Sequence, residues 1–374
     1  MHLSYCTNVH PAEDLDGVIR QLDTAAGPIR RAADLDTLGV GLWLPAPLAA
    51  RLATEPAALD RLRTALDRNG LEVRTLNAFP YEAFHAEVVK LDVYRPDWTD
   101  PARLDYTIDA ARVLAALLPP GAEGSISTLP LGWRVGWDDA ADRAATDALV
   151  ALGAELRAIR AETGRVIRLA VEPEPGCVLD DVDDVVAWLS AHRDRLDLDH
   201  IGVCLDTCHL AVSFADPAGA VARIAEAGIR VVKVQASAAL HVERPADADA
   251  RRVVGTYQED RYLHQVREQA TGGAIRVDDL PEALDRLPAE APWRVHFHVP
   301  LHLEPEAPLS STTDVLRTAL AAVREAQPVD QLHVDVETYT WSVLPGGPVD
   351  LIDGIAAELR WAAAELLERE GQPA

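Results

Sequence analysis

The sequence has few cysteines, and it lacks any long apolar run. Its cysteines are Cys6, Cys177, Cys204 and Cys208, and no two of them form a Cys-x-x-Cys pair. This excludes a disulfide framework and a zinc knuckle, and we expect reduced, partly buried thiols. No stretch of 18 apolar residues is present, and the first residues lack the basic and apolar segments of a secretion signal. We therefore expect a soluble, cytoplasmic protein without membrane insertion.

Basic residues are scarce relative to acidic ones. The chain carries 60 aspartates and glutamates against 35 lysines and arginines, which gives a formal net charge of -25. Such a charge repels phosphate backbones, and the densest basic stretch, 51–68, is interrupted by acids, so we exclude nucleic acid as a partner. Only Lys90 and Lys233 are lysines. Because lysine offers a compact, titratable ammonium that arginine lacks, both are candidates for functional positions.

The sequence does contain a regular alternation of short apolar segments and amphipathic helical stretches. With 374 residues, of which 48% are hydrophobic, it has enough apolar side chains for a large core. Nine segments are rich in apolar, β-branched residues: 3–7, 40–44, 72–76, 125–129, 166–171, 201–205, 231–234, 294–297 and 332–336. Strands that alternate with helices predict an α/β fold with a parallel sheet and right-handed crossovers.

Two observations favour a closed barrel over an open sheet. Neither a Gly-x-Gly-x-x-Gly motif after the first strand nor a Walker motif is present, so the nucleotide-binding signatures of open sheets are lacking. Ligand-type side chains instead end most predicted strands, namely Asn8, Trp43, Asn77, Glu172, Asp206, Gln235, His298 and Glu337. Functional groups from many strand ends gather on one face of a barrel. We therefore predict a single (β/α)8 TIM barrel over 1–374, with a disordered tail at 371–374.

Nine strand candidates compete for eight places in this barrel. The stretch after the seventh strand is too long for one crossover. We therefore predict an insertion at 236–293, between the seventh and last strands, that folds over the barrel mouth. In this interpretation the segment around His296 and His298 belongs with the insertion, and 332–336 closes the barrel. The alternative places 125–129 outside the barrel.

Three acidic residues stand where strands end. Glu172 precedes a proline, which marks the point where the chain leaves the sheet. Asp206 is followed three residues later by His209, which can lean back toward that carboxylate, and Glu337 ends the last predicted strand. Three acids at close range repel one another, so we expect Mn²⁺, Mg²⁺, Co²⁺, Fe²⁺ or Zn²⁺ between them. The alternative for each acid alone is a helix cap or an arginine partner.

The order of these residues resembles that of a known family. Glu172 with its proline, the Asp206-x-x-His209 motif and the final Glu337 are similar to the motifs of the xylose isomerase-like TIM barrels. That family includes sugar and sugar-phosphate isomerases and epimerases, and the endonuclease IV type of phosphodiesterase. The resemblance implies a metal set of Glu, Asp, His and Glu, of which Glu172, Asp206 and Glu337 fill three places.

Longer stretches resemble one group in particular, the metabolite traffic protein EboE. They are 2–11, 75–81, 84–85, 88–90, 124–133 and 259–264. The group is named for a gene cluster tied to moving a biosynthetic precursor. The resemblance therefore implies a protein that handles a small metabolite.

The chain departs from the family at the seventh strand, where Gln235 stands in place of the family's histidine ligand. An amide oxygen is a weaker ligand than an imidazole. We expect His298 or His296 to replace the missing ligand, and His264 is the reserve. The predicted metal set is Glu172, Asp206, His298 and Glu337.

The other site residues are assigned from this arrangement. Glu172 and Glu337 are expected to move a proton between neighbouring carbons, and His209 to orient an oxygen. Lys233 is expected to hold a substrate oxygen, with a structural ion pair as the alternative, and Lys90 lies in a loop that we expect to act as a lid. The predicted substrate-binding residues are Asn8, Trp43, Asn77, Tyr81, His85, Gln235 and His296.

Isomerisation or epimerisation of a sugar-like or polyol small molecule is thus the predicted function. Two alternatives stay open: a metal-dependent phosphoester hydrolase, and a non-catalytic metabolite-binding component of a biosynthesis or transport pathway. The positions of His296 and His298 separate the enzyme from the binder. Imidazoles within coordination distance of Asp206 and Glu337 favour the enzyme, whereas imidazoles that face away favour the binder.

Overall fold

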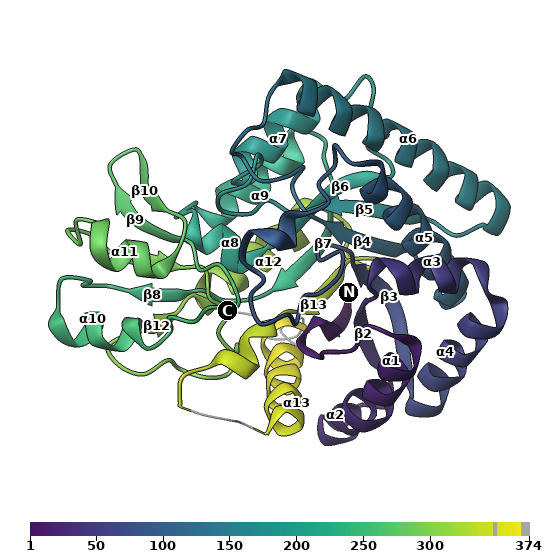
Figure 1. Ribbon diagram of the computed structural model, residues 1–374, viewed down its shortest axis with the longest axis horizontal. Coiled ribbons are helices and arrows are strands. Elements are labelled where there is room, and N and C mark those ends of the chain that lie inside the picture. Colours follow the sequence, from purple (N-terminus) through teal and green to yellow (C-terminus); the bar gives the residue numbers. More distant parts are fainter. Residues whose placement is uncertain (347–349, 368–374) are drawn as a thin grey trace.

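A closed barrel of parallel strands forms the body of the molecule. The computed structural model describes residues 1–346 and 350–367, so the predicted tail at 371–374 lies outside the described residues. The strand order is β1-β13-β7-β6-β5-β4-β3-β2 (Figure 1). The strands are β1 (His2–Cys6), β2 (Leu38–Trp43), β3 (Leu71–Asn77), β4 (Gly124–Thr128), β5 (Ile167–Val171), β6 (Ile201–Asp206), β7 (Val231–Ala236) and β13 (His333–Val336). The predicted (β/α)8 TIM barrel is confirmed.

Each barrel strand overlaps a predicted strand, because apolar, β-branched segments suit a sheet that is covered on both faces. The strand β4 pairs with both β3 and β5, so the alternative that placed 125–129 outside the barrel is wrong. The strand β13 closes the ring, with Asp335 opposite Gln235 of β7 and opposite Ser4 of β1. The first and last barrel strands therefore lie side by side.

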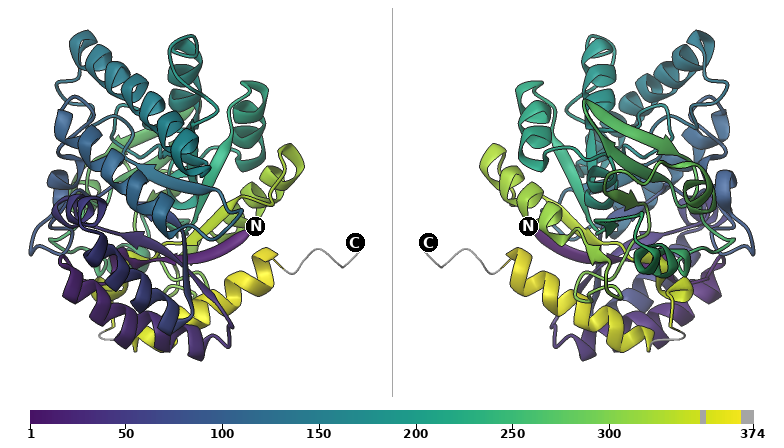
Figure 2. Two further views of the ribbon diagram at one scale, coloured as in Figure 1. Left: turned by 90° about the vertical axis from the view of Figure 1, so that its right-hand side faces the viewer. Right: turned by 90° about the vertical axis from the view of Figure 1, so that its left-hand side faces the viewer.

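Helices surround the barrel (Figures 1 and 2). They are α1 (Leu15–Gln21), α2 (Gly27–Ala32), α3 (Ala46–Thr54), α4 (Pro56–Asn69), α5 (Pro101–Leu117), α6 (Asp139–Thr163), α7 (Val182–Ala191), α8 (Thr207–Val212), α9 (Pro217–Glu226), α12 (Thr313–Ala326) and α13 (Leu351–Ala362). Side-chain caps start several of them: Asp138 accepts hydrogen bonds from the first backbone N–H groups of α6, and Asp181 does so for α7. The helix α4 ends at Gly70, whose φ of 65° is left-handed and favours glycine.

A second, antiparallel sheet interrupts the barrel between β7 and β13. Its strand order is β10-β9-β11-β8-β12. It consists of β8 (Leu240–Val242), β9 (Val266–Ala270), β10 (Gly273–Val277), β11 (Trp293–Val295) and β12 (Ser310–Ser311), with α10 (Ala248–Gly255) and α11 (Leu280–Arg286). The sheet stands at one side of the barrel (Figures 1 and 2). The predicted strand 294–297 overlaps β11, so it belongs to this sheet and not to the barrel.

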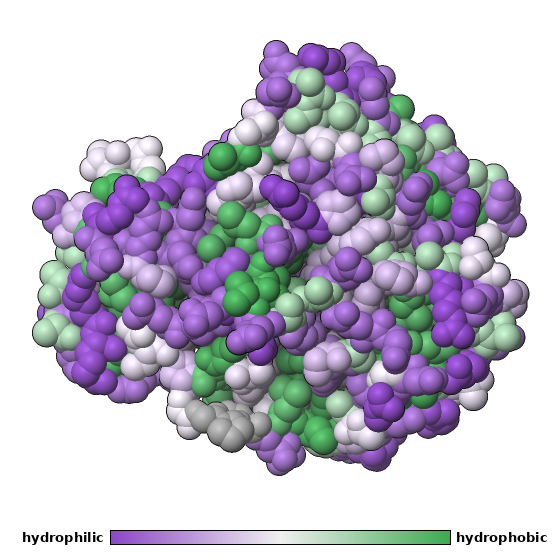
Figure 3. All heavy atoms as spheres, in the orientation of Figure 1, coloured by the Kyte–Doolittle hydropathy of each residue, from purple (hydrophilic) through white to green (hydrophobic). Residues whose placement is uncertain are grey.

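The polarity of the surface, and the length and apolar character of the helices, limit the surroundings that the chain can contact. The face in Figure 3 is mostly hydrophilic, with hydrophobic groups exposed near its centre. Within residues 1–346 and 350–367, no helix combines the length and the apolar character that a membrane crossing needs.

Candidate functional site

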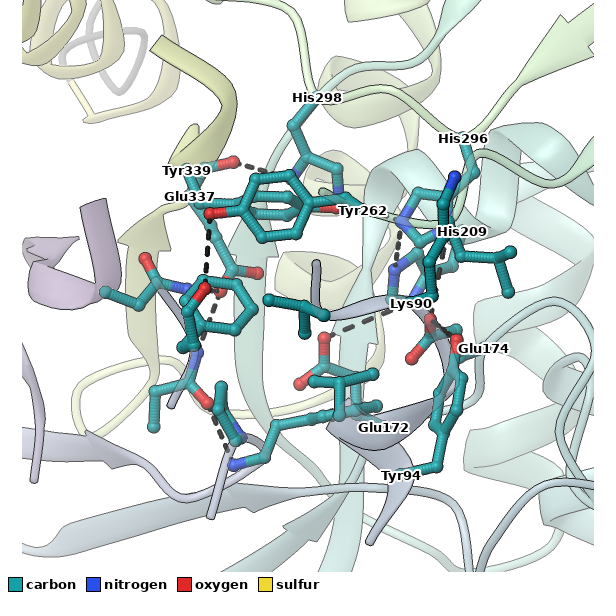
Figure 4. Close-up of a pocket in the computed structure, with 18 residues that line it drawn as sticks. Lys90, Tyr94, Glu172, Glu174, His209, Tyr262, His296, His298, Glu337 and Tyr339 are labelled. Atoms are coloured by element: carbon teal, nitrogen blue, oxygen red, sulfur yellow. Dashed lines mark hydrogen bonds and ion pairs between the residues drawn. The ribbon is translucent and has the colours of Figure 1, made fainter. Parts of the chain in front are cut away.

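The carboxyl ends of the barrel strands and the inserted segment share a pocket of about 530 Å³. Barrel residues in its wall are Asn8, Asn77, Glu172 and Glu337, and the segment between β7 and β13 adds Tyr262, His296 and His298. The labelled carboxylates and imidazoles turn toward the same space (Figure 4). The pocket therefore lies at the barrel face that hosts the active sites of TIM-barrel enzymes.

Three buried carboxylates meet at this face. Glu172 follows β5, Asp206 ends β6 and caps α8, and Glu337 follows β13. Each offers an oxygen, and these oxygens lie within 4.8 Å of one another. In the ring, β5 and β6 are neighbours, and β13 lies two places beyond β6. This strand order brings together Glu172 and Glu337, which are 165 residues apart in sequence (337 minus 172).

Hydrogen bonds orient two of these carboxylates and leave several oxygens unused. Oδ1 of Asp206 accepts from the backbone N–H of His209 at 2.9 Å and from Oγ of Ser237 at 2.8 Å. Oε1 of Glu337 accepts from the side-chain amides of Asn8 and Asn77, both at 2.8 Å. Within the described residues, Oε2 of Glu172 and Oδ2 of Asp206 are buried and accept no hydrogen bond. Buried oxygens without donors are costly, and these two are available to a cation or a ligand.

The carboxylates also perturb one another's proton affinity. Burial raises the pKa of Glu172 well above its ordinary value, and the nearby charges of Glu337 and Asp206 add to this effect. Burial, assisted by Asp206, raises the pKa of Glu337 to about 8. Without a cation, Glu172 and Glu337 therefore retain protons at higher pH than an ordinary glutamate.

Three imidazoles lie beside the carboxylates. Nε2 of His209 is 3.1 Å from Nε2 of His296, which is in turn 3.3 Å from Nε2 of His298. Nε2 of His298 lies 4.0 Å from Oδ2 of Asp206, whereas its Nδ1 contacts the backbone oxygen of Glu337 at 2.7 Å. Burial lowers the pKa of His298 to about 4 and that of His296 well below its ordinary value. The inserted segment thus delivers neutral imidazoles to the edge of the carboxylate group.

Comparison with known proteins identifies the fold family. The profile described as "Xylose isomerase-like TIM barrel" matches residues 29–266, which is more than half of the chain. The chain belongs to the xylose isomerase-like TIM barrel family. A search of curated protein sequences gives no match.

Solved structures resemble the fold of the chain over nearly its whole length. A candidate sugar phosphate isomerase/epimerase from Anabaena variabilis is 14% identical, with a TM-score of 0.53 and 98% of each chain covered. The IolI protein with a binding zinc atom is 12% identical, with a TM-score of 0.51 and 99% of each chain covered. D-allulose 3-epimerase from Methylomonas sp. in complex with D-allulose is 11% identical, with a TM-score of 0.51, 98% of this chain and 97% of that chain covered. At these identities the likeness shows the fold.

Gln235, which the resemblance sets in the place of a histidine ligand, is buried in the barrel. Gln235 lies on β7, paired in register with Asp206 on one side and Asp335 on the other. It is fully buried, and within the described residues neither its amide oxygen nor its nitrogen makes a hydrogen bond. Among the described residues, the side-chain amide of Gln235 is thus buried without a hydrogen bond, as are Oε2 of Glu172 and Oδ2 of Asp206.

Lys233 is placed away from the pocket. Its ammonium lies inside the barrel, 2.8 Å from Oδ2 of Asp335 and 3.4 Å from Oγ of Ser127. Burial by itself would lower the pKa of Lys233. The negative charge of Asp335 outweighs this effect, so the pKa of Lys233 is raised. This geometry matches the ion-pair alternative for Lys233, so we do not place it in contact with a substrate.

The other predicted substrate-binding residues divide into two groups. Asn8, Asn77 and His296 line the pocket, whereas Trp43, Tyr81, His85 and Gln235 are absent from the described lining. The indole nitrogen of Trp43 donates to the backbone oxygen of Pro80 at 3.1 Å. His85 contacts the backbone oxygen of Asn8 at 2.6 Å, so it supports a pocket residue and does not face the pocket.

Several pocket residues were not among the predicted site residues. Glu174 lies two residues after Glu172 and accepts a hydrogen bond from the hydroxyl of Tyr94 at 2.6 Å. Its spacing from Glu172 is a signal that could have identified it, because alternate residues of extended chain share a side. Tyr262 and Tyr339 also line the pocket, with ring centroids 4.9 Å apart. Tyr262 comes from a loop and Tyr339 begins the short 3-10 helix Tyr339–Val343, and neither segment is long enough to show a sequence periodicity.

The loop that contains Lys90 covers part of the pocket. Lys90 lines it, and its ammonium pairs with Asp279 of the inserted segment at 2.7 Å. The backbone N–H groups of Val89 and Lys90 both donate to the backbone oxygen of Arg261. The segment that contains Lys90 is thereby fastened to the insertion at the edge of the pocket.

Proposed function

We propose that the protein is a divalent-metal-dependent isomerase or epimerase that acts on a sugar-like or polyol small molecule. The observation that carries this proposal is the group of buried carboxylates Glu172, Asp206 and Glu337, which face one another with unused oxygens. The D-allulose 3-epimerase of similar fold lends it support, because that structure is a complex with D-allulose.

The donor set fits a hard divalent cation. Oxygen ligands from carboxylates suit Mg²⁺, Mn²⁺ and Co²⁺, and mixed sets extend the choice to Fe²⁺ and Zn²⁺. Glu172, Asp206 and Glu337 would hold the ion, with His298 or Gln235 as the fourth donor. A bound cation would polarise a substrate carbonyl and the neighbouring hydroxyl.

The proton transfer falls to the side chains of the chain itself. Glu172 and Glu337 approach the same space from β5 and β13, so one carboxylate can take a proton from a carbon and the other can protonate its neighbour. The raised pKa of Glu337 keeps a protonated form accessible near neutral pH. Asn8 and Asn77 fix the orientation of Glu337, and Nδ1 of His209 is 4.0 Å from Glu172.

Aromatic side chains make the pocket suitable for a small, uncharged molecule. Phe84, Tyr262 and Tyr339 pack ring against ring in the pocket wall and give it an apolar surface. Lys90 is the lysine in the described lining, and its ammonium is engaged by Asp279. A phosphoester would meet three carboxylates and no free cationic side chain there, so we favour a neutral polyol over the phosphoester hydrolase alternative.

We further propose that this activity serves metabolite traffic of the EboE type. The support is that the stretches resembling EboE also carry pocket residues: 2–11 contains Asn8, 75–81 contains Asn77, and 259–264 contains Tyr262. The substrate would then be the small metabolite that such a pathway moves or prepares.

Isotope exchange tests the proposed chemistry. The purified protein is incubated in deuterated water with a panel of ketoses, aldoses and polyols, after growth with added Mn²⁺, Co²⁺ or Zn²⁺. We expect deuterium on a product carbon with the wild type and none with Glu337→Gln. Tight binding of a panel member with no exchange under any metal would contradict the isomerase proposal and support the non-catalytic binder.

A further inference from the structure

The side chains that line the pocket divide into a polar and an apolar group according to where they stand in the chain. The carboxylate and amide side chains stand at or shortly after the ends of barrel strands, as Asn77 does on β3, Glu172 after β5 and Glu337 after β13. The apolar side chains stand in the segments beyond the strand ends, namely Phe79, Pro80, Phe84, Val89, Val93 and Leu263. The pocket therefore has a polar part at the barrel and an apolar part built by the connecting segments.

The apolar part of the pocket continues to the exterior of the protein. Most of its side chains belong to one hydrophobic cluster, which consists of Trp43, Phe84, Val89 and Tyr262, with Val93 and Tyr339 packed against it. Val88 and Leu91 flank the lining residues 89–90, and their side chains are 55% and 45% exposed. The segment 88–93 thus carries apolar surface from the wall of the pocket to the solvent.

Polar groups that lie among these apolar side chains are engaged within the protein. The hydroxyl of Tyr94 donates to Glu174 at 2.6 Å, and that of Tyr262 donates to the backbone oxygen of Phe84 at 3.5 Å. The ammonium of Lys90 pairs with a carboxylate of the inserted segment, and Figure 4 shows these three side chains around the labelled acids. A ligand hydroxyl placed there would have to displace an existing contact, and a hydroxyl buried without a partner is unfavourable.

A free sugar or polyol therefore suits only the polar part of the pocket, because it carries a hydroxyl on nearly every carbon. An aromatic ring can pack against the C–H face of a sugar, but the aliphatic side chains of Val89, Val93 and Leu263 offer its hydroxyls no partner. The pocket volume of about 530 Å³ lies within the range of about 300–1,000 Å³ that is typical of sites for drug-sized ligands. The pocket thus has room for an apolar group beside a sugar-sized head.

We propose that the substrate is amphiphilic, with a hydroxylated head that carries an apolar substituent. The position of the head at Glu172 and Glu337 rests on the proposed function. The substituent lies against Phe84, Val93 and Leu263 and extends along the segment 88–93 toward the exterior. Because apolar surface that leaves water contributes to affinity, substituted polyols bind more tightly than free sugars.

A homologous series of ligands tests this substrate class. The probes are D-fructose and its 6-O-methyl, 6-O-butyl and 6-O-hexyl ethers, which share an unchanged carbonyl and neighbouring hydroxyls. Their binding to the full-length protein in the presence of Mn²⁺ is measured by calorimetry. We expect the affinity to rise about two- to fourfold with each added methylene, because burial of a methylene removes apolar surface from water. An affinity that does not depend on the length of the alkyl chain would overturn the proposal.

A polar substitution in the wall locates the alkyl chain. Val93→Thr keeps the branched shape of the side chain and places a hydroxyl in the apolar part, so we expect it to weaken binding of the hexyl ether by about threefold or more and to leave the methyl ether unaffected. The matched control is Val186→Thr, because Val186 is also partly buried against the main core but lies on α7, outside the pocket lining. Leu263→Asn repeats the test from the inserted segment if Val93→Thr does not fold. Equal binding of the hexyl ether by the wild type and the wall variant that folds would overturn the proposal.

The same ligands separate this proposal from the proposed function. Glu337→Gln changes only the polar part, so it should keep the dependence of affinity on chain length while it abolishes deuterium exchange. A rise in affinity along the series with no exchange of any ether in deuterated water would support the amphiphilic ligand and overturn the isomerase. Exchange of D-fructose, together with equal affinities for all four ligands, would support the isomerase and overturn the amphiphilic substrate.

Discussion

Two layers of the barrel interior differ in whether their buried charged side chains are paired. In the inner layer, Lys233 pairs with Asp335, which also accepts a hydrogen bond from Ser4 at 2.6 Å. In the layer at the carboxyl ends of the strands, Glu172, Asp206 and Glu337 meet, and among the described residues no lysine or arginine is paired to them. The charges of the inner layer are paired with each other, whereas Oε2 of Glu172 and Oδ2 of Asp206 in the outer layer have no hydrogen-bond partner among the described residues. We therefore assign the inner layer to the stability of the barrel and the outer layer to the proposed function.

The largest effect should come from breaking the complete layer. In Lys233→Met the carboxylate of Asp335 stays buried without its partner, and removing one member of a buried pair costs about 3–5 kcal/mol. We expect the free energy of unfolding in urea to fall by about that amount. In Lys90→Met, which breaks a partly exposed pair with Asp279, we expect a loss of about 0–1 kcal/mol. Similar losses of unfolding free energy in Lys233→Met and Lys90→Met would contradict the structural role of the buried Lys233–Asp335 pair.

The incomplete layer should respond to pH in the metal-free protein. The pKa of Glu337 is about 8 in the folded state against an ordinary value of 4.5, so between these values the folded state holds the extra proton. Stability is therefore fully present below pH 4.5 and declines as the pH rises toward 8. Thermal unfolding of the metal-free wild type from pH 5 to 8.5 should show this decline. A Glu337→Gln variant with an undiminished slope would assign the decline to other groups.

Loss of an orienting amide should weaken the outer layer by less. In Asn77→Ala, Glu337 loses one of its two amide donors, and such supporting hydrogen bonds typically affect metal affinity about 10–100-fold. We expect a drop in Mn²⁺ or Co²⁺ affinity within that range, measured by calorimetry. The matched control is Asn69→Ala, because Asn69 is also buried but lies at the end of α4, where it donates to Asp23 and the backbone of Ala65.

The smallest effect on stability should come from neutralising an acid of the incomplete layer. Burial keeps the pKa of Glu172 well above its ordinary value, so Gln resembles the protonated side chain. We expect the free energy of unfolding of metal-free Glu172→Gln to stay within about 1 kcal/mol of the wild type, while metal binding by the carboxylates is lost. A destabilisation as large as that of Lys233→Met would show that both layers are structural.

The comparison of layers also explains what could be predicted from the sequence. The ends of the strands can be predicted from the sequence. The positions of Glu172, Asp206 and Glu337 at one face of the barrel therefore follow from the alternation of strands and helices. Strand periodicity correctly turns Lys233 into the barrel interior but does not give its height along the barrel, and Lys233 lies outside the pocket lining, paired with Asp335. Height depends on the stagger of neighbouring strands around the barrel, which no single segment encodes.

The imidazoles show the other limit of sequence reasoning. The pair His296 and His298 was recognisable as unusual, but its approach to His209 depends on how the second sheet packs. The same holds for Gln265, which orients His296 from the start of that sheet. Pairings such as β11 with β8 and β9 join segments that are distant in the chain, and turn signals alone do not determine them.

The adjacency of β1 and β13 has a consequence for synthesis of the protein. The strand that leaves the ribosome early finds one of its two neighbours only when residues 333–336 have emerged. Until then β1 and β7 each present an open edge, and such edges readily pair with other chains. Nascent chains are thus most vulnerable to aggregation while the inserted sheet is being made, and a chaperone that shields these two edges would act in that interval.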